Sequence, residues 1–185
     1  MILVALLILV FIGFAAVGID IGHLSVVRNE LQNAADAGCL AGARFLYLED
    51  GLAVNENSNQ IAYQAAIANK SEKTPADVHW SAGNAGDVER GHWSFATRTF
   101  TPADLTEPVD LWDVSSEELD ANPAFINALR VKTRREDTPI ASFFAGIFGF
   151  ENFSLSREAI AYVDLRGRSL PEKQISLLPF AGRAS

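Results

Sequence analysis

The first 19 residues, Met1–Ile19, carry no charged side chain, and this feature constrains the chain most. Thirteen of them are Leu, Ile, Val or Phe. A helix of this length rises about 28 Å, which matches the hydrocarbon thickness of a bilayer. At roughly 0.3 to 0.6 kcal/mol per apolar residue, insertion is favoured by roughly 4 to 8 kcal/mol. Asp20 opposes insertion, but it lies at the end of the stretch, where a charge costs less. We therefore expect a helix that inserts into a membrane.

A cleaved secretory signal is a weaker interpretation of the same segment. It lacks a basic leading region, its apolar stretch is too long, and no small-x-small site precedes a polar mature start. The first basic residue is Arg28, so Lys and Arg cannot orient the segment in the bilayer. A membrane segment that begins without Lys or Arg predicts that Met1 is a processed or truncated start.

Apolar and small residues continue beyond Ile19 with heptad spacing, from Leu24 to Leu48, which keeps one stripe towards a partner helix. No proline interrupts the chain before Asp50, so we expect one helix over residues 1–48. Packing against copies of itself, in a bundle or helical filament, is predicted for Leu6, Leu9, Phe11, Gly13, Phe14, Val17, Asp20, Leu24, Val27, Leu31, Ala34, Gly38, Ala41 and Phe45. For residues 34–48 packing against the chain's own domain is an equal alternative, whereas residues 1–19 require lipid or other subunits.

All charges lie in the remaining residues, which have the pattern of an α+β domain over residues 49–164. We expect a helix over 59–69, a β-hairpin of strands 77–82 and 91–100, a strand over 126–135, a short helix over 140–148 and a strand over 153–164. Together these elements predict a pilin-like α+β fold, with a small antiparallel sheet and short helices laid against the long helix. Residues 165–185 are predicted to form an extended tail.

Composition and motifs argue against several functions. The chain has 15 Lys and Arg against 23 Asp and Glu, a net charge of −8, which disfavours nucleic-acid binding. Its single cysteine, Cys39, cannot form an intrachain disulfide, a Cys-rich zinc site or a redox pair. Motifs of hydrolases, nucleotide-binding proteins and zinc proteases are not found. We therefore expect no catalytic residues, no metal and no cofactor, in a protein that is not an enzyme.

Two local patterns suggest binding sites. The tripeptide His-Trp-Ser occurs twice, at His79 and at His92. In a symmetric hairpin Trp80 and Trp93 would face each other, and cross-strand aromatic packing is preferred to a metal-binding histidine pair. An acidic run from Asp104 to Asp120 lacks the spacing and glycine of a calcium loop, so a solvated loop is preferred. An envelope ligand-binding module that uses these features is an alternative function.

Charged residues at the end of the apolar segment predict ion pairing. His23 follows Asp20 by three residues on the same helical face, and Arg28 is the next basic residue. Pairing among Asp20, His23 and Arg28 at the membrane border is one interpretation. Another is that Asp20 neutralises a positive group of an adjacent subunit, because intramembrane carboxylates are candidates for function. Farther on, a basic stripe of residues 130–135 could meet the acidic loop of the same chain or of a neighbour.

Two stretches of sequence carry a family resemblance. The first comprises Gly18-Ile-Asp-Ile-Gly-His-Leu24, Val27-Arg-Asn-Glu-Leu-Gln-Asn-Ala-Ala-Asp-Ala37 and Leu40-Ala-Gly-Ala43. The second comprises Asn127-Ala-Leu-Arg-Val131, Pro139 and Phe143-Phe-Ala-Gly-Ile-Phe-Gly149. Both resemble the TadE/TadG-like proteins of the Flp/Tad pilus system. Two departures are that Ala5 stands where typical pilins have a glutamate, and that the metal-binding adhesion motif of larger TadG-type members is absent.

The resemblance implies a membrane-anchored, pilin-like protein that takes part in building adhesive pili. Its N-terminal helix would lie in the bacterial inner membrane or in the core of a surface filament, with the domain outside the cytoplasm. Its partners would be the membrane before assembly, copies of itself and other pilus-system proteins. We expect a structural filament subunit. The alternative within the same family is an inner-membrane-anchored assembly factor that does not polymerise.

Overall fold

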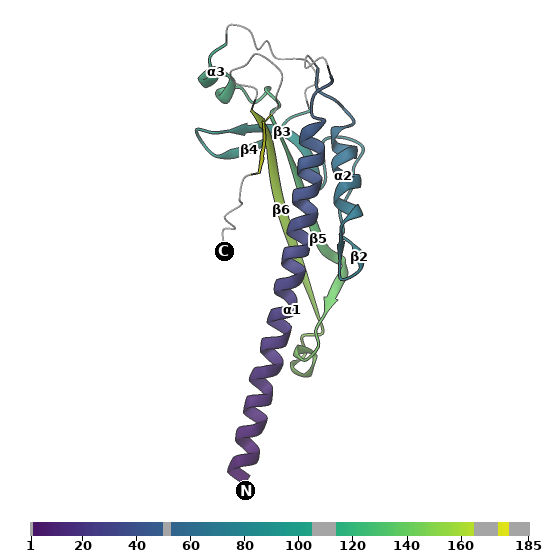
Figure 1. Ribbon diagram of the computed structural model, residues 1–185, viewed down its shortest axis with the longest axis vertical. Coiled ribbons are helices and arrows are strands. Elements are labelled where there is room, and N and C mark those ends of the chain that lie inside the picture. Colours follow the sequence, from purple (N-terminus) through teal and green to yellow (C-terminus); the bar gives the residue numbers. More distant parts are fainter. Residues whose placement is uncertain (1, 50–52, 105–113, 165–173, 178–185) are drawn as a thin grey trace.

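A single helix organises the molecule. In the computed structural model, which describes residues 2–49, 53–104, 114–164 and 174–177, helix α1 spans Ile2–Arg44. Its N-terminal half projects beyond the rest of the protein, and its C-terminal half lies along the domain (Figure 1). The helix ends at Arg44 rather than at residue 48. The N–H groups of Phe45 and Leu46 donate to carbonyls three residues back, which tightens and closes the last turn.

The remaining elements form one layer of helix and one of sheet, which confirms the α+β fold. Helix α2 (Ser58–Ala68) packs beside α1, and a short hairpin pairs β1 (Lys70–Ser71) with β2 (Thr74–Pro75). The main sheet is antiparallel, in the order β4-β3-β5-β6-β7. Its strands are β3 (Val88–Ser94), β4 (Thr99–Pro102), β5 (Ala128–Ala141), β6 (Asn152–Asp164) and β7 (Gln174–Leu177), and a short helix, α3 (Ser116–Ala121), precedes β5. Strand β7 lies in the predicted tail.

The predicted hairpin of strands 77–82 and 91–100 is wrong. Strand β3 instead pairs with β4 and β5, so that Trp93 faces Phe100, while Trp80 forms an isolated bridge with Gly86. Because β4 and β5 occupy both edges of β3, no edge of β3 is left for residues 77–82. The side chain of Asn84 bonds to the backbone of β3 instead. Its amide donates to the carbonyl of Arg90 at 2.7 Å and its oxygen accepts from the N–H of Arg90 at 2.6 Å. The carbonyl of Arg90 also accepts the N–H group of Ala103, the residue that follows β4.

The predicted helix over 140–148 is also wrong in most of its length. Strand β5 continues through Pro139 to Ala141, with a register shift between Arg135 and Ile140. The carboxylate of Asp77 accepts the N–H groups of residues 136–138 at 3.0 to 3.1 Å. Because the irregularity is stabilised in this way, a proline is tolerated within a strand. Only Ala145–Phe148 is helical, as the short 3-10 helix η1.

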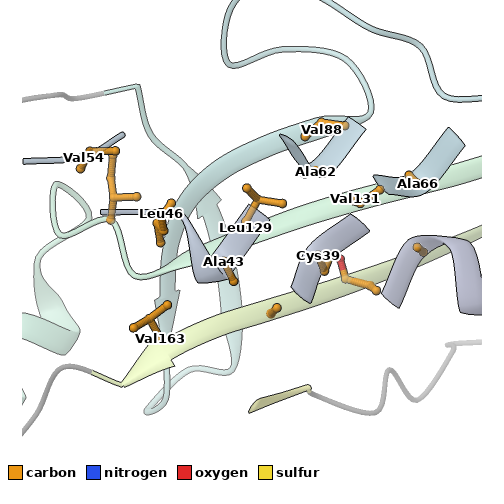
Figure 2. Close-up of a cluster of buried hydrophobic side chains, with 14 of the residues drawn as sticks. Cys39, Ala43, Leu46, Val54, Ala62, Ala66, Val88, Leu129, Val131 and Val163 are labelled. Atoms are coloured by element: carbon orange, nitrogen blue, oxygen red, sulfur yellow. Dashed lines mark hydrogen bonds between the residues drawn. The ribbon is translucent and has the colours of Figure 1, made fainter. Parts of the chain in front are cut away.

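The core lies between α1, α2 and the sheet (Figure 2). Leu129 and Val131 of β5 face small residues of the helices, including Ala62. At Gly42, α1 lies very close to both α2 and β5. A Cβ added there would lie 2.7 Å from the Cβ of Ala62 and 2.7 Å from Cδ1 of Leu129. The small residues of α1 therefore allow close packing within the chain. Of the two alternatives for residues 34–48, the structure shows the intrachain one.

The lone cysteine reports on this packing. Cys39 is fully buried, and its thiol donates to the carbonyl of Ala159 on β6, with Sγ and O 2.9 Å apart. Burial raises the pKa of the Cys39 thiol. Only the thiolate reacts with maleimides, so we expect the native protein in detergent to label at a small fraction of the rate measured in denaturant. Rapid labelling of the native protein would show that α1 leaves the sheet. A surface cysteine, Thr97→Cys, serves as the control.

Candidate membrane and assembly surface

The N-terminal half of α1 presents apolar side chains on every side. From Ile2 to Phe14 its large side chains are between 50% and 80% exposed. By length and composition α1 is able to cross a membrane, although such helices also occur in signal sequences and soluble cores. A helix that is apolar all round needs lipid or other protein around it. Among the residues that the structure describes, the first one buried in this half is Ala16.

The fourteen predicted packing positions divide at Asp20. Before it, Leu6, Leu9, Phe11, Phe14 and Val17 are exposed and Gly13 is half-buried. After it, the chain's own domain buries Val27, Leu31, Ala34 and Gly38, half-buries Leu24 and Ala41, and leaves Phe45 exposed. A second cluster of buried apolar side chains contains Val27, Leu31 and Ala34 of α1. It also contains Ile140 of β5 and Ala76, which follows β2. The positions free to meet lipid or another copy are thus chiefly those before Asp20.

Asp20 connects α1 to the tip of the long β5–β6 hairpin. It is only 5% exposed. Its carboxylate accepts the backbone N–H groups of Phe143 at 2.9 Å, Phe144 at 3.1 Å and Ala145 at 2.6 Å. The first N–H groups of a helix have no acceptor within the helix, so a negative charge beside them is favoured. These three donors lie at the start of η1. The carboxylate is therefore held by the chain's own backbone, a partner that the sequence did not suggest.

His23 is held by a different part of the fold. Its Nε2 lies 2.6 Å from Oε1 of Glu72, whose other oxygen accepts from Arg135 at 3.0 Å. Glu72 and Lys73 form the two-residue turn between β1 and β2, both with positive φ, as tight hairpin turns require. The predicted pairing of Asp20, His23 and Arg28 is thus replaced within the chain by separate contacts, and Arg28 is exposed. We call Asp20, His23, Glu72 and the backbone of Phe143–Ala145 the joint.

Removal of the Asp20 carboxylate should loosen the hairpin tip. We expect Asp20→Ala to abolish the hydrogen-exchange protection of the amides of residues 143–145, because these donors lose their acceptor. Amides of β5 near Leu129 should keep their protection. Asp36→Ala, which removes an aspartate of the same helix that contacts Gln32, is the matched control. Unchanged exchange at the tip of Asp20→Ala would contradict the role assigned to this carboxylate.

The two His-Trp segments lie in unrelated surroundings. The ring of His79 contacts Asp137 at 3.0 Å and is half exposed. His92 is buried, and its ring nitrogens lie 2.7 Å from the carbonyls of Phe125 and Asp120. The ring of Trp80 packs at a tilt against that of Tyr63, with the centroids 5.0 Å apart, rather than against Trp93. Among residues 2–49, 53–104, 114–164 and 174–177, no group of three or more His, Cys, Asp or Glu side chains is placed to hold a metal ion.

The acidic run is used locally where the structure describes it. Residues 105–113 of this run lie outside the described part of the chain. Asp104 pairs with Arg90, and Glu118 completes a capping box with Ser115 at the start of α3. Asp120 accepts the N–H groups of Phe95 at 2.6 Å and Ala96 at 3.0 Å. These described carboxylates thus stabilise turns and helix ends.

The Asp120 contacts should depend on pH. Burial raises the pKa of the Asp120 carboxyl, but hydrogen bonds from Phe95 and Ala96 outweigh burial and hold the pKa below its ordinary value. Its stabilisation is therefore complete above about pH 4 and is lost as the pH falls through the folded-state pKa. We expect the amide of Ala96 to lose protection over that acidic range. Asp120→Asn should remove this pH dependence, and a dependence that persists would contradict the assignment.

The basic stripe meets carboxylates of its own chain outside the acidic run. Arg130 pairs with Glu89 on β3, and Arg134 pairs with Asp87. Arg135 is buried and bonds Glu72 of the joint. These pairs lie between neighbouring strands and turns. Arg130, Arg134 and Arg135 of the stripe therefore stabilise the fold through ion pairs with described residues of the same chain.

The fold and the exposed helix define a class of protein. In this class an α+β domain is attached to one long helix, and the N-terminal half of the helix is apolar on all sides and able to cross a bilayer. Residues 1–44, a range that contains α1, match the family described as Flp pilus-assembly TadE/G-like. Residues 41–161 match the family described as Tad-like Flp pilus-assembly. The chain belongs to this Tad-like family of Flp pilus assembly, which confirms the resemblance seen in the sequence. No curated protein and no solved structure matches it.

Proposed function

We propose that the chain is a structural subunit of a Tad/Flp-type pilus, held in the bacterial inner membrane before assembly and packed by its N-terminal helix in the filament. The observation that carries this proposal is the apolar stretch of α1 from Ile2 to Ile19, whose large side chains are exposed. Because no charge interrupts it, lipid and the apolar helices of other copies are equally suitable surroundings. A protein that moves from bilayer to filament needs such a helix. The domain would lie outside the cytoplasm and cover the filament.

The domain's construction supports a structural role. Several charged side chains of the domain form ion pairs within the chain, such as Arg134 with Asp87 and Arg135 with Glu72. Its contacts with α1 bury Val27, Leu31 and Ala34, so the helix and the sheet form one body. A subunit of this kind acts by its shape and its apolar rod, without catalysis.

The proposal is tested on filaments sheared from cells that produce the full chain. Antibodies raised against the α+β domain should decorate the filaments along their whole length in electron micrographs. A strain that lacks the chain should form none. If the antibodies leave the filaments undecorated, and detergent extracts hold the chain only as a membrane monomer, the chain is an assembly factor and the proposal fails.

A further inference from the structure

The tip of the β5–β6 hairpin is an exposed apolar surface that the fold does not bury. Four side chains of this tip, Phe143, Ile147, Phe148 and Phe150, are between 63% and 80% exposed. No side chain from Thr138 to Phe150 is charged. Exposed apolar patches of this kind mark contact with another surface.

The position of the tip indicates which surface this is. Figure 1 shows the loop between β5 and β6 beside α1, at the end of the domain from which the helix projects. The Asp20 carboxylate fixes it there through the N–H groups of Phe143, Phe144 and Ala145. Asp20 is also the first charged residue of the chain, at the end of an apolar segment about as long as a bilayer is thick. In a bilayer crossed by α1, the tip would therefore lie level with the membrane border.

The backbone of the tip is suited to an environment poor in water. Hydrogen-bond donors at membrane depth must find partners within the protein. Besides the three N–H groups held by Asp20, further donors of the tip bond inside it, namely Ser142 to Glu151, Ile147 to Phe144, Gly149 to Gly146 and Phe150 to Ala145. Gly149, at φ 88°, closes η1 in a left-handed conformation that a side chain would strain. The phenylalanines can thus contact lipid while few polar groups are exposed with them.

We propose that this tip is a second membrane contact, with its phenylalanines and Ile147 inserted among the lipid headgroups and upper acyl chains beside α1. The inference rests on the proposed function, specifically on the membrane-held state that precedes assembly. The occupant of the surface is a lipid bilayer. Continuity with the apolar helix supports this choice, because the two uncharged stretches lie side by side at one end of the molecule.

The test uses the full chain in vesicles of equal parts phosphatidylethanolamine and phosphatidylglycerol. In a Cys39→Ser background, which keeps a donor towards Ala159, single cysteines are placed at three positions and labelled with an environment-sensitive dye. Ile147→Cys reports on the tip, Leu9→Cys on the helix, and Thr97→Cys on an exposed turn elsewhere in the domain. Ile147 is 80% exposed, so its replacement leaves the core intact. Nitroxide lipids, labelled near the headgroup or near the chain end, quench dye at matching depth.

We expect the Ile147→Cys dye to shift its emission to the blue and to lose most of its intensity with the shallow nitroxide. The Leu9→Cys dye should be quenched by the deep nitroxide, and the Thr97→Cys dye by neither. If Leu9→Cys is quenched while Ile147→Cys stays solvent-like, the tip inference fails and the membrane helix stands. A blue shift at Ile147→Cys without quenching would mean that protein covers the tip, which also overturns the inference. Absence of quenching at Leu9→Cys would overturn the membrane-held state itself.

Discussion

A Leu9→Arg variant is expected to attach to membranes more weakly than the unaltered protein. Leu9 lies near the middle of the uncharged segment, where an arginine costs about 2.5 to 3.5 kcal/mol on the insertion scale and the lost leucine removes about 0.5 kcal/mol more. The total of about 3 to 4 kcal/mol removes much or all of the roughly 4 to 8 kcal/mol that favours insertion. The same charge inside a bundle of apolar helices would be unpaired, so incorporation into filaments should fall as well.

The measurement is the fraction of the full chain that resists alkaline extraction from membranes, together with its amount in sheared filaments. Asn33→Arg is the matched control, because it adds the same charge to an exposed position of the same helix beyond the apolar segment. That variant should behave as the unaltered protein does. Normal extraction resistance and normal filament content of Leu9→Arg would contradict both the membrane helix and its role in packing.

A Gly42→Leu variant is expected to lose about 2 kcal/mol of unfolding free energy. Replacement of a helical glycine by leucine gains about 1 kcal/mol in helix propensity, but overpacking of a filled core costs up to about 3 kcal/mol. Overpacking dominates here because an added Cβ already lies 2.7 Å from the Cβ of Ala62. The two helices would have to move apart, which would also disturb Leu129.

Urea unfolding in detergent, followed by near-ultraviolet circular dichroism, measures this effect. Gly13→Leu is the matched control, because a Cβ at Gly13 meets no heavy atom within 4 Å in the described part of the chain. It should leave the domain's unfolding unchanged. Equal stability of the two variants would show that α1 and α2 do not pack closely at Gly42. The Cys39 labelling rate gives an independent measure of the same packing.

Regular hydrophobic periods made the main elements predictable. The long helix, the helix near 58–68 and the strands near 128–135 and 152–164 each follow a clear pattern of alternation or helical spacing. The fold class followed from their order. The heptad stripe of α1 was ambiguous, because small residues such as Gly38 and Gly42 suit a partner helix and the chain's own α2 equally. Only the three-dimensional structure separates these alternatives.

The parts that could not be predicted depend on single polar side chains that bond to the backbone of other segments, two of them far away in the sequence. Asn84 occupies backbone groups of Arg90, and Asp77 stabilises the irregular stretch of β5 around Pro139. Asp20 accepts the N–H group of Phe143, a residue 123 positions later. No local pattern records such contacts. The exposure of the hairpin tip could not be predicted either, because the apolar sequence of Phe143–Phe150 is equally compatible with a buried helix.

Helix α1 runs without a break from Ile2 to Arg44, so its exposed apolar segment is connected rigidly to the domain. Any rotation of this segment about the helix axis therefore also rotates the sheet. In the proposed filament, the contacts of residues 1–19 would therefore determine which side of the domain faces outward. Substitutions among the first nineteen residues could thus re-aim the entire exterior of an assembly without altering a single surface residue of the domain.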